Sequence, residues 1–522
     1  MKWPCSHNGM PAVALLCLLA SPGAAAETVE APELYSQHCA SCHGMDRLGG
    51  SGPALLPENL SRVKKEEAYQ AILEGLPATR MPSFRSALNE AQARALVDHI
   101  FTPLPETPVW GIENIRETRI HYRSPDAADN RPVYSADPLN LFVVVESGDH
   151  HVTILDGDRL EPLHRFRTRH ALHGGPKFSP DGRYVYLASR DGWITKYDLY
   201  SLQPVAEIRA GINTRNIAAS KDGRYLLAGN TLPHTLVILD AQDLSPRHVI
   251  AVEDGHGNSS RVSAVYDAPP RKSFIVALKD LPEIWEVIYD AEAGPVYQGL
   301  VHDYRYQEAI ADTSPFPVRR IRLDDYLDDF FFDAEYRNLI GAARNAENGQ
   351  VVSLIVGKKI AEVDLPGLPH LGSGITWEYR GKPVLATPNL KEGAVSIIDV
   401  TTWKTIKKIE TLGPGFFMRT HENTPYGWVD VFFGPHRDAV HVIDKSTLEI
   451  VKTLRPAPGM TSGHVEFTRD GRYALLSIWE KEGALVVYDA ATLEEVKRIA
   501  MSKPSGKYNV YNKISGSGGT SH

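Results

Sequence analysis

Cysteine is scarce in this 522-residue sequence. It has four cysteines, and Cys5 and Cys17 lie near the N-terminus, which leaves one pair for the rest of the chain. That count excludes a framework of several disulfides. Positive charge is not in excess either, because 56 Lys and Arg face 64 Asp and Glu and the net charge is −8. The chain therefore has no overall positive field that would recruit nucleic acid or an acidic membrane surface.

Long apolar runs are absent as well. The run at residues 11–20 (PAVALLCLLA) spans about ten residues, too short to cross a bilayer as a helix, and no later run reaches the required length. Lys2 precedes this run and the small residues 24–26 follow it, which is typical of an export signal. We predict a signal peptide over 1–26 and a periplasmic mature protein. A buried N-terminal helix is the alternative, whereas a lipoprotein cut before Cys17 is disfavoured by the leucine ahead of it.

The remaining cysteines, Cys39 and Cys42, belong to the motif CASCH, which ends at His43. This spacing is typical of a c-type haem attachment site. The two thiols would form thioethers to the haem vinyl groups, and His43 would ligate the iron. The export signal and the helical lead-in at 32–38 favour this interpretation over a zinc or redox site with the same spacing.

Met81 follows a stretch that bears glycine and proline, 75–80, and is the candidate for the second iron ligand, with plain packing as the alternative. The segment 88–101 has the apolar spacing of an amphipathic helix. Residues 27–102 are therefore predicted to form a small all-α domain that resembles a class I cytochrome c. The proline-rich residues 103–112 are predicted to form a semi-rigid linker.

Beyond the linker the pattern becomes strand-like and one motif recurs. Each copy has a turn, an apolar strand, a polar gap and a second apolar strand that usually ends in Asp. Eight copies occupy residues 137–156, 179–198, 220–240, 268–290, 333–356, 380–399, 424–444 and 468–489. A repeat of this size with several strands per copy is typical of a β-propeller. We predict an all-β eight-bladed propeller over 113–513 and a flexible tail over 514–522; two β-sandwiches or a solenoid explain the recurrence less well.

An export signal, a class I cytochrome c, a linker and an eight-bladed propeller follow one another in this chain. This order resembles the cytochrome cd1 nitrite reductase family over essentially the whole mature chain. Matching stretches include 37–44 (QHCASCHG), 171–173 (ALH) and 505–512 (SGKYNVYN). The resemblance implies a covalent haem c in the helical domain. It also implies that the central opening of the propeller binds haem d1, a non-covalent tetrapyrrole.

The resemblance further implies which residues hold the tetrapyrrole. His173 stands in the place of the proximal iron ligand. Arg190 and Arg215 match arginines that line the pocket, and the guanidinium fork suits carboxylates. Tyr266 and Trp479 are expected to stack against the macrocycle or to wall it. The alternatives are solvation at the surface for the arginines and packing inside a blade for the aromatic residues.

The chain departs from the nitrite reductases at the distal side of the tetrapyrrole. Those enzymes place two histidines there; one matches His370, and the other falls in 325–332, where this chain offers Asp328. A carboxylate is normally an anion at neutral pH and would repel nitrite. His421 lies in a turn region ahead of a strand pair, and His464 lies in a similar place. We expect His421 to be the distal ligand or proton acceptor, with His370 as its rival and Asp328 as an orienting group.

These departures make the chain more similar to the dihydro-haem d1 dehydrogenases of the same family. The resemblance implies oxidation of a propionate of dihydro-haem d1 to the acrylate of haem d1, with a histidine as the base and electrons passing through haem c. A cytochrome cd1 nitrite reductase and a haem d1 carrier without catalysis are the alternatives. The expected partners are the tetrapyrrole substrate, haem d1 assembly proteins, a recipient nitrite reductase and a periplasmic electron acceptor.

Overall fold

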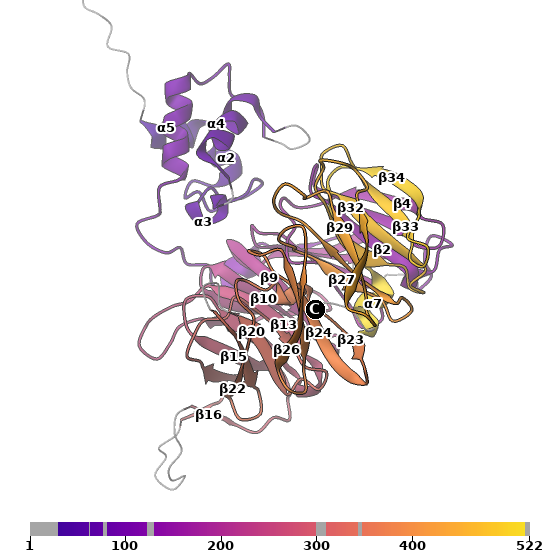
Figure 1. The fold of residues 1–522 in the computed structure, drawn as a ribbon. Helices are drawn as coiled ribbons and strands as arrows, with labels where there is room; N and C mark the ends of the chain where they lie inside the picture. The colour runs from indigo at the N-terminus through magenta and orange to yellow at the C-terminus, as the bar shows by residue number, and fades with distance from the viewer. Residues whose placement is uncertain are drawn as a thin grey trace, which may run out of the picture.

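The computed structural model describes residues 30–61, 63–76, 81–122, 130–298, 310–342 and 347–516. The predicted signal peptide and the last six residues of the predicted tail lie outside these ranges. The chain forms a small helical domain that stands on one end of a ring of β-sheets (Figure 1). Within the described ranges, no helix combines the length and the apolar character that a membrane crossing requires.

The helical domain has five helices around one apolar core. They are α1 (Ala31–His38), α2 (Ala40–His43), α3 (Pro57–Leu60), α4 (Lys65–Glu74) and α5 (Glu90–Ile100). The side chain of Asn89 accepts a hydrogen bond from the amide of Gln92 and so caps the start of α5. Leu96 and Ile100 of α5 pack against Leu34 and Tyr35 of α1 in the same cluster. The amphipathic helix predicted over 88–101 is therefore present as α5.

Within the described residues, the ring consists of eight blades, each with four antiparallel strands, and a further short strand pairs with the outer edge of the second blade. The first strand of each blade lies innermost; these strands are β35 (Pro504–Asn509), β5 (Lys177–Phe178), β9 (Asn213–Ala219), β13 (Val262–Ala268), β19 (Asp329–Phe332), β23 (Ile375–Tyr379), β27 (Met418–Thr420) and β31 (Ser462–Phe467). The second strands are β2 (Leu141–Glu146), β6 (Tyr184–Ala188), β10 (Tyr225–Leu232), β14 (Ser273–Leu278), β20 (Asn338–Ala342), β24 (Lys382–Pro388), β28 (Tyr426–Asp430) and β32 (Tyr473–Ile478). The predicted eight-bladed propeller is confirmed.

The outer half of each blade completes the sheet. The third strands are β3 (His151–Asp156), β7 (Trp193–Asp198), β11 (Thr235–Asp240), β15 (Glu283–Ile288), β21 (Gly349–Ser353), β25 (Ala394–Asp399), β29 (Val440–Asp444) and β33 (Gly483–Asp489). The outermost strands are β4 (Glu161–Arg167), β8 (Gln203–Arg209), β12 (Pro246–Ala251), β18 (Val318–Arg322), β22 (Lys358–Val363), β26 (Lys404–Glu410), β30 (Glu449–Leu454) and β34 (Glu495–Met501). A hairpin of β16 (Val296–Gln298) and β17 (Ile310–Asp312) is inserted into the fourth blade.

The recurrent sequence motif corresponds to fixed turns of each blade. The Ser-Pro-Asp-Gly turn at Ser179 joins the first strand to the second, and Gly182 adopts the left-handed conformation with φ of 74° that favours glycine. The Asp that ends a third strand accepts the amide two residues further on, as Asp198 does from Tyr200 at 2.9 Å. Such Asx turns explain why the copies end in Asp.

The ring is closed by its C-terminal strand. β35 pairs antiparallel with β2, so that the first blade combines both ends of the propeller sequence. Helix α7 (Val510–Ser515) follows, with Val510 fully buried in the core beside β2. The predicted boundary between propeller and tail at residue 513 falls inside this helix, and Ile514 packs against the same core.

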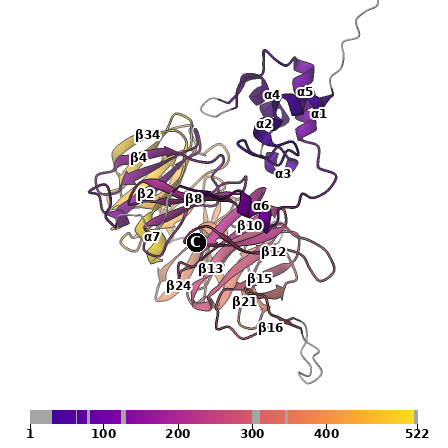
Figure 2. The same ribbon diagram turned by 180° about the vertical axis from the view of Figure 1, so that it is seen from behind.

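The helical domain contacts the end of the propeller where the first strands begin. Arg209 donates to the Leu48 carbonyl at 2.6 Å, and Asn59 donates to the Ile212 carbonyl, just before β9, at 3.0 Å. Ala54 and Leu56 pack with Ile212 in an apolar cluster. The helical domain is thus fixed at this end of the propeller, beside α6 (Ile112–Glu117) and β10 (Figure 2). We call the centre of the ring, which the eight innermost strands surround, the central channel.

The predicted linker is attached to the propeller. The Trp110 ring nitrogen donates to the Arg209 carbonyl at 3.1 Å, and the Arg209 guanidinium lies 5.0 Å from the Trp110 ring centre. Helix α6 (Ile112–Glu117) begins at the last residue of that linker, and β1 (Ile120–His121) pairs with the outer strand β8. These contacts leave little freedom for the helical domain to swing away.

Candidate functional site

The CASCH motif lies where α1 passes into α2. Cys39 is the C-cap residue of α1 and is buried, and Cys42 lies one helical turn further on with partial exposure. Neither thiol is in a disulfide. Burial raises the pKa of the Cys39 thiol to about 11. Two free thiols three residues apart on one short helix are the groups that thioether attachment requires.

His43 is fixed in the orientation that an iron ligand needs. Its Nδ1 lies 2.8 Å from the Pro53 carbonyl, so Nδ1 carries the proton and Nε2 keeps its lone pair. The ring is buried and presses on Gly52, where a Cβ would lie 2.8 Å from the ring. Burial lowers the pKa of His43 and keeps the imidazole neutral. Met81 packs against the same helical core. These residues fit a covalently attached haem c.

A second cluster lies at the end of the propeller that faces the helical domain. The Nδ1 atom of His173 lies 2.9 Å from the Arg215 carbonyl, so Nε2 again keeps its lone pair. Arg190 Nη2 lies 2.8 Å and Arg215 Nη1 3.3 Å from that Nε2. The structure therefore brings His173, Arg190 and Arg215 together. A neutral imidazole nitrogen flanked by two guanidinium groups fits an iron tetrapyrrole that carries carboxylate side chains.

Tyr266 and Asp329 form the next part of this cluster. Tyr266 lies on the innermost strand β13, and its hydroxyl donates to Asp329 Oδ1 at 2.8 Å. Asp329 Oδ2 accepts the amide of Gly372 at 2.7 Å. Burial raises the pKa of Tyr266 well above its usual value, so the phenol stays protonated. Asp329 thereby joins the fourth, fifth and sixth blades at the channel.

The two carboxylates at the start of β19 have different surroundings. Asp328 lies just before β19, and its Oδ1 lies 3.8 Å from the Lys279 ammonium, whereas Asp329 is the one that meets Tyr266 and whose charge acts on His370. Successive residues of a strand point in opposite directions. Asp329 is thus the carboxylate that lies beside Tyr266 and acts on His370, and an orienting role of Asp328 stays a prediction.

His370 and His464 both lie at this end of the channel. The Nδ1 atom of His370 lies 2.5 Å from the Phe416 carbonyl, and burial lowers its pKa. The His464 ring contacts the rings of Phe417 and Tyr508 at 4.7 Å and 5.1 Å between centroids. Burial also lowers the pKa of His464 well below its usual value. His464 Nδ1 is buried and has no hydrogen-bond partner among the described residues.

An aromatic wall stands beside these histidines. Trp479 lies 5.9 Å from Phe417 and 4.7 Å from Phe432 between ring centroids. The Trp479 ring nitrogen is buried and, within the part of the chain that the structure describes, it has no hydrogen-bond partner. The predicted wall residue Trp479 thus belongs to the same end of the channel as His464.

His421 lies at the opposite end of the propeller from His173. It follows the end of β27, whereas Phe417 precedes that strand. The ring is 1% exposed, contacts Phe467 at 6.0 Å and packs on Gly471 in the turn of the next blade. Its Nδ1 accepts the amide of Asn423 at 3.1 Å. The structure does not bring His421 together with His173, and the expectation that His421 is the distal ligand or base is not supported by its position.

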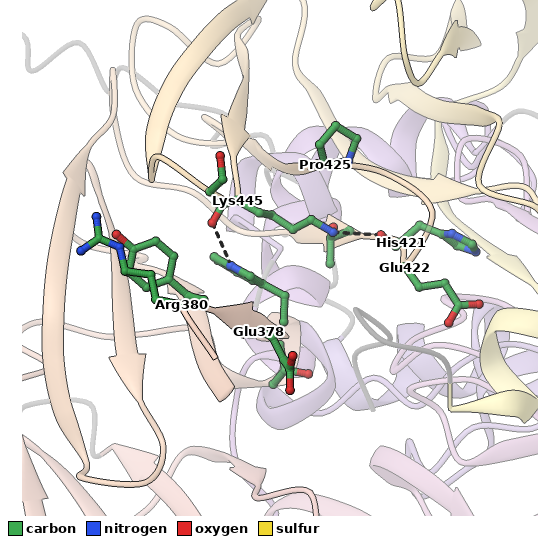
Figure 3. A pocket seen from close by; sticks show the side chains of 11 residues that line it. Glu378, Arg380, His421, Glu422, Pro425 and Lys445 are labelled. Carbon is green, nitrogen blue, oxygen red and sulfur yellow. Dashed lines mark hydrogen bonds between the residues drawn. The ribbon is translucent and has the colours of Figure 1, made fainter. Parts of the chain in front are cut away.

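A cavity with His421 in its lining lies at this opposite end. Its volume is about 440 Å³, and Trp377, Tyr379 and Lys445 line it. Lys445 donates to the backbone carbonyl of His421 at 3.2 Å, while the imidazole points away from Arg380 and Glu378 (Figure 3). The His421 ring therefore serves the packing of two turns.

Comparisons with known proteins agree with this arrangement. Residues 136–306 and 305–513 match the family described as cytochrome D1 heme domain, and residues 26–100 match cytochrome C oxidase, cbb3-type, subunit III. The chain belongs to the cytochrome D1 heme domain family. It is 56% identical over 502 residues to dihydro-heme d1 dehydrogenase of Pseudomonas aeruginosa, with 96% of this chain and 98% of that protein covered.

Two further similarities define its place in the family. A solved structure of dihydro-heme d1 dehydrogenase NirN in complex with DHE has a TM-score of 0.86, 56% sequence identity, and covers 92% of this chain and 99% of that chain. Nitrite reductase of Stutzerimonas stutzeri is 25% identical over 552 residues, with 95% of both chains covered. The similarity to the dehydrogenase is thus much stronger than the similarity to the reductase.

Proposed function

We propose that this chain oxidises a propionate side chain of dihydro-haem d1 to the acrylate of haem d1 and passes the electrons to its haem c. The observation that carries the proposal is the joint position of three groups. Three features lie at one end of the channel: the imidazole of His173 flanked by two arginines, the neutral histidine His464, and the haem c domain. The near full-length similarity to a dihydro-heme d1 dehydrogenase supports the same reaction.

The reaction removes two hydrogens from a CH2–CH2 arm. In total, two protons and two electrons leave, and a carbon–carbon double bond forms. One proton must go to a base, and the second must go to another histidine or to solvent. Because haem c takes one electron at a time, each acrylate requires two oxidised haem c groups or an external acceptor that reoxidises haem c between the two electrons. We assign the base to His464, because its pKa is lowered and its buried Nδ1 has no other partner among the described residues. His370 is the second candidate, with Nε2 as its available atom.

The other members of the cluster would bind and orient the tetrapyrrole. His173 Nε2 is the proposed proximal ligand of the tetrapyrrole iron, and Arg190 and Arg215 are the proposed carboxylate clamps. Tyr266 is held by Asp329 at 2.8 Å and walls the channel. Lys177, whose pKa burial lowers to about 8, lies 6.0 Å from the Tyr266 ring and adds a further cation.

The helical domain provides the route for electrons. Haem c, when attached to Cys39 and Cys42, supplies one-electron redox chemistry. His43 and Met81 would ligate the haem iron when the group is attached. The contacts between Leu48 and Arg209 hold the helical domain over the channel, so the haem site stays at a fixed place relative to the tetrapyrrole site.

Nitrite reduction fits the cluster less well. Asp329 presents carboxylate oxygens beside His370 and Tyr266, where nitrite would require a cationic or neutral donor. A carrier without catalysis would have no use for an electron relay. The same proposal includes export to the periplasm and a periplasmic electron acceptor. It also includes contact with haem d1 assembly proteins and delivery of haem d1 to a nitrite reductase.

The proposal is tested by offering both substrates to the purified haem c protein. Incubation with dihydro-haem d1 and an excess of oxidised acceptor should yield a tetrapyrrole that is lighter by two mass units. Incubation with nitrite and a reductant should yield no nitric oxide at respiratory rates, which are on the order of 1 s⁻¹ or faster. Unchanged tetrapyrrole mass together with rapid nitric oxide formation would replace the proposal by nitrite reduction.

A further inference from the structure

The backbone of His464 is held in an unusual conformation. Its φ is 56°, in the left-handed region that residues with a Cβ rarely adopt. Such a conformation persists only where the surrounding structure fixes it. Neighbouring groups must therefore fix the backbone of His464.

One carboxylate, that of Asp430, binds the loops of both histidines. Asp430 ends the second strand β28 of the seventh blade and is 1% exposed. Its Oδ1 accepts the amides of Phe416 at 2.7 Å and Phe417 at 3.0 Å. Its Oδ2 accepts the amide of His464 at 3.1 Å. The carbonyl of Phe416 in turn lies 2.5 Å from Nδ1 of His370.

Lys507 holds the other side of the His464 peptide. It lies on β35, is fully buried, and donates to the carbonyl of His464 and, at 2.8 Å, to the Ser477 hydroxyl. Gly463 makes the arrangement possible, because a Cβ there would lie 2.6 Å from Asp430 Oδ2. Backbone N–H and C=O of His464 are thus each bonded to a buried charged side chain.

We infer that Asp430 is a positioning residue, which fixes His464 directly and His370 through Phe416, and that Lys507 completes the support of His464. This inference rests on the proposed function for the role of His464. Asp430 touches neither imidazole ring, so its effect is on where the rings stand rather than on proton transfer itself. A displacement of about 1 Å in a catalytic group costs roughly 100-fold in rate.

The primary test is Asp430→Asn in the full-length haem c protein. Asparagine keeps the size but has one accepting oxygen, so it cannot accept all three amides. Hydrogen exchange of peptides that contain Phe416, Phe417 and His464 should become faster. The kcat for dihydro-haem d1 oxidation should fall about 10–100-fold with KM within about twofold. Asp444→Asn is the matched control, because Asp444 accepts the amides of Ser446 and Thr447 in an outer turn of the same blade.

A combined variant distinguishes positioning from an independent role. If Asp430 acts through His464 and His370, adding Asp430→Asn to a protein that already carries His464→Gln and His370→Gln should lower kcat no further than those two changes alone. Effects that multiply would overturn the inference, as would unchanged exchange at these amides. If Asp430→Asn does not fold, Lys507→Met provides the same test, with faster exchange expected at His464. If the wild-type protein leaves dihydro-haem d1 unchanged, the proposed function fails, and the exchange data still decide whether Asp430 holds the two loops.

Discussion

At the scale of single residues, the histidines of the two sites differ in which ring nitrogen has a hydrogen-bond partner. In His43, His173 and His370, a backbone carbonyl lies within hydrogen-bond distance of Nδ1, so Nε2 carries the lone pair. In His173 that Nε2 meets the guanidinium groups of Arg190 and Arg215. His464 differs, because its buried Nδ1 has no such partner among the described residues. His43 and His173 are the proposed iron ligands, whereas His464 is the proposed base and His370 the second candidate for that role.

His173→Ala should weaken tetrapyrrole binding roughly 10–100-fold, because the variant loses the nitrogen that the Arg215 carbonyl orients toward the channel. The haem c spectrum should be unchanged, since His43 lies in the other domain. Titration with the tetrapyrrole, followed by its absorption bands, measures both effects. Equal affinity for variant and wild type would assign the iron to another residue.

His464→Gln should lower the rate of dihydro-haem d1 oxidation by about 10²–10⁴, the usual loss for a general base. His421→Gln is the control, because its ring is packed between turns at the opposite end of the channel. That variant should turn over at nearly the wild-type rate. A large loss in His421→Gln with full activity in His464→Gln would reverse the assignment.

At the scale of elements, the blades are joined by buried polar contacts as well as by apolar packing. Arg419 on β27 donates to Glu466 on β31 at 2.7 Å, and the side chains are 5% and 2% exposed. Asn512 on α7 donates to the same carboxylate at 3.0 Å. Two inner strands and the closing helix therefore meet at one ion pair.

Arg419→Met should lower the free energy of unfolding by about 3–5 kcal/mol, because Glu466 would stay buried without the guanidinium that pairs with it. Lys65→Met is the control: Lys65 and Asp98 form an exposed pair with side chains 59% and 70% exposed, worth about 0–1 kcal/mol. Denaturant unfolding compares the two. A loss no larger in Arg419→Met than in Lys65→Met would contradict this account of ring closure.

His441 on β29 provides a pH-dependent contribution. Its Nδ1 lies 2.8 Å from the Thr453 hydroxyl, and its Nε2 accepts the amide of Leu412 at 3.1 Å. Burial, assisted by Arg455, lowers its pKa to about 4. The unfolded chain binds this proton below about pH 6.5 and the folded chain does not, so the stability is complete above that pH and is lost as pH falls toward 4.

Unfolding free energy measured between pH 7 and 4.5 should therefore fall less steeply in His441→Gln than in the wild type. The expected difference is on the order of 2 kcal/mol over this range. His256→Gln, at an exposed position, should leave the slope unchanged. Identical slopes in all three proteins would show that His441 is not the group that titrates.

At the scale of the whole molecule, much of the architecture could be predicted from the sequence. Asp-Gly turns at 179–182, 220–223 and 468–471 and strands that end in Asp recur in several blades, because these blades repeat the same local chemistry. The CASCH motif located the haem site because thiol spacing on a helix is a local property. His173, Arg190 and Arg215 could be matched through the family resemblance.

The positions of two site residues became clear only from the three-dimensional structure. His421 lies beside a turn that joins a first strand to a second strand. All such turns lie at the end of the ring opposite the loop of His173, so the order of strands in the sequence could have shown that His421 is far from His173. Asp329 is one residue further along the chain than Asp328, a step that reverses the direction of the side chain on a strand. Asp430 lies on a second strand and meets His464 only because neighbouring blades pack together.

The central claim joins the two domains: dehydrogenation in the propeller delivers electrons to haem c. The most direct measurement mixes the oxidised haem c protein with dihydro-haem d1 anaerobically, without an external acceptor, and records the haem c spectrum and the tetrapyrrole mass in the same sample. The account predicts that two haem c groups are reduced for each tetrapyrrole that becomes lighter by two mass units, and that His464→Gln suppresses both. Haem c that stays oxidised while the tetrapyrrole mass is unchanged would contradict it.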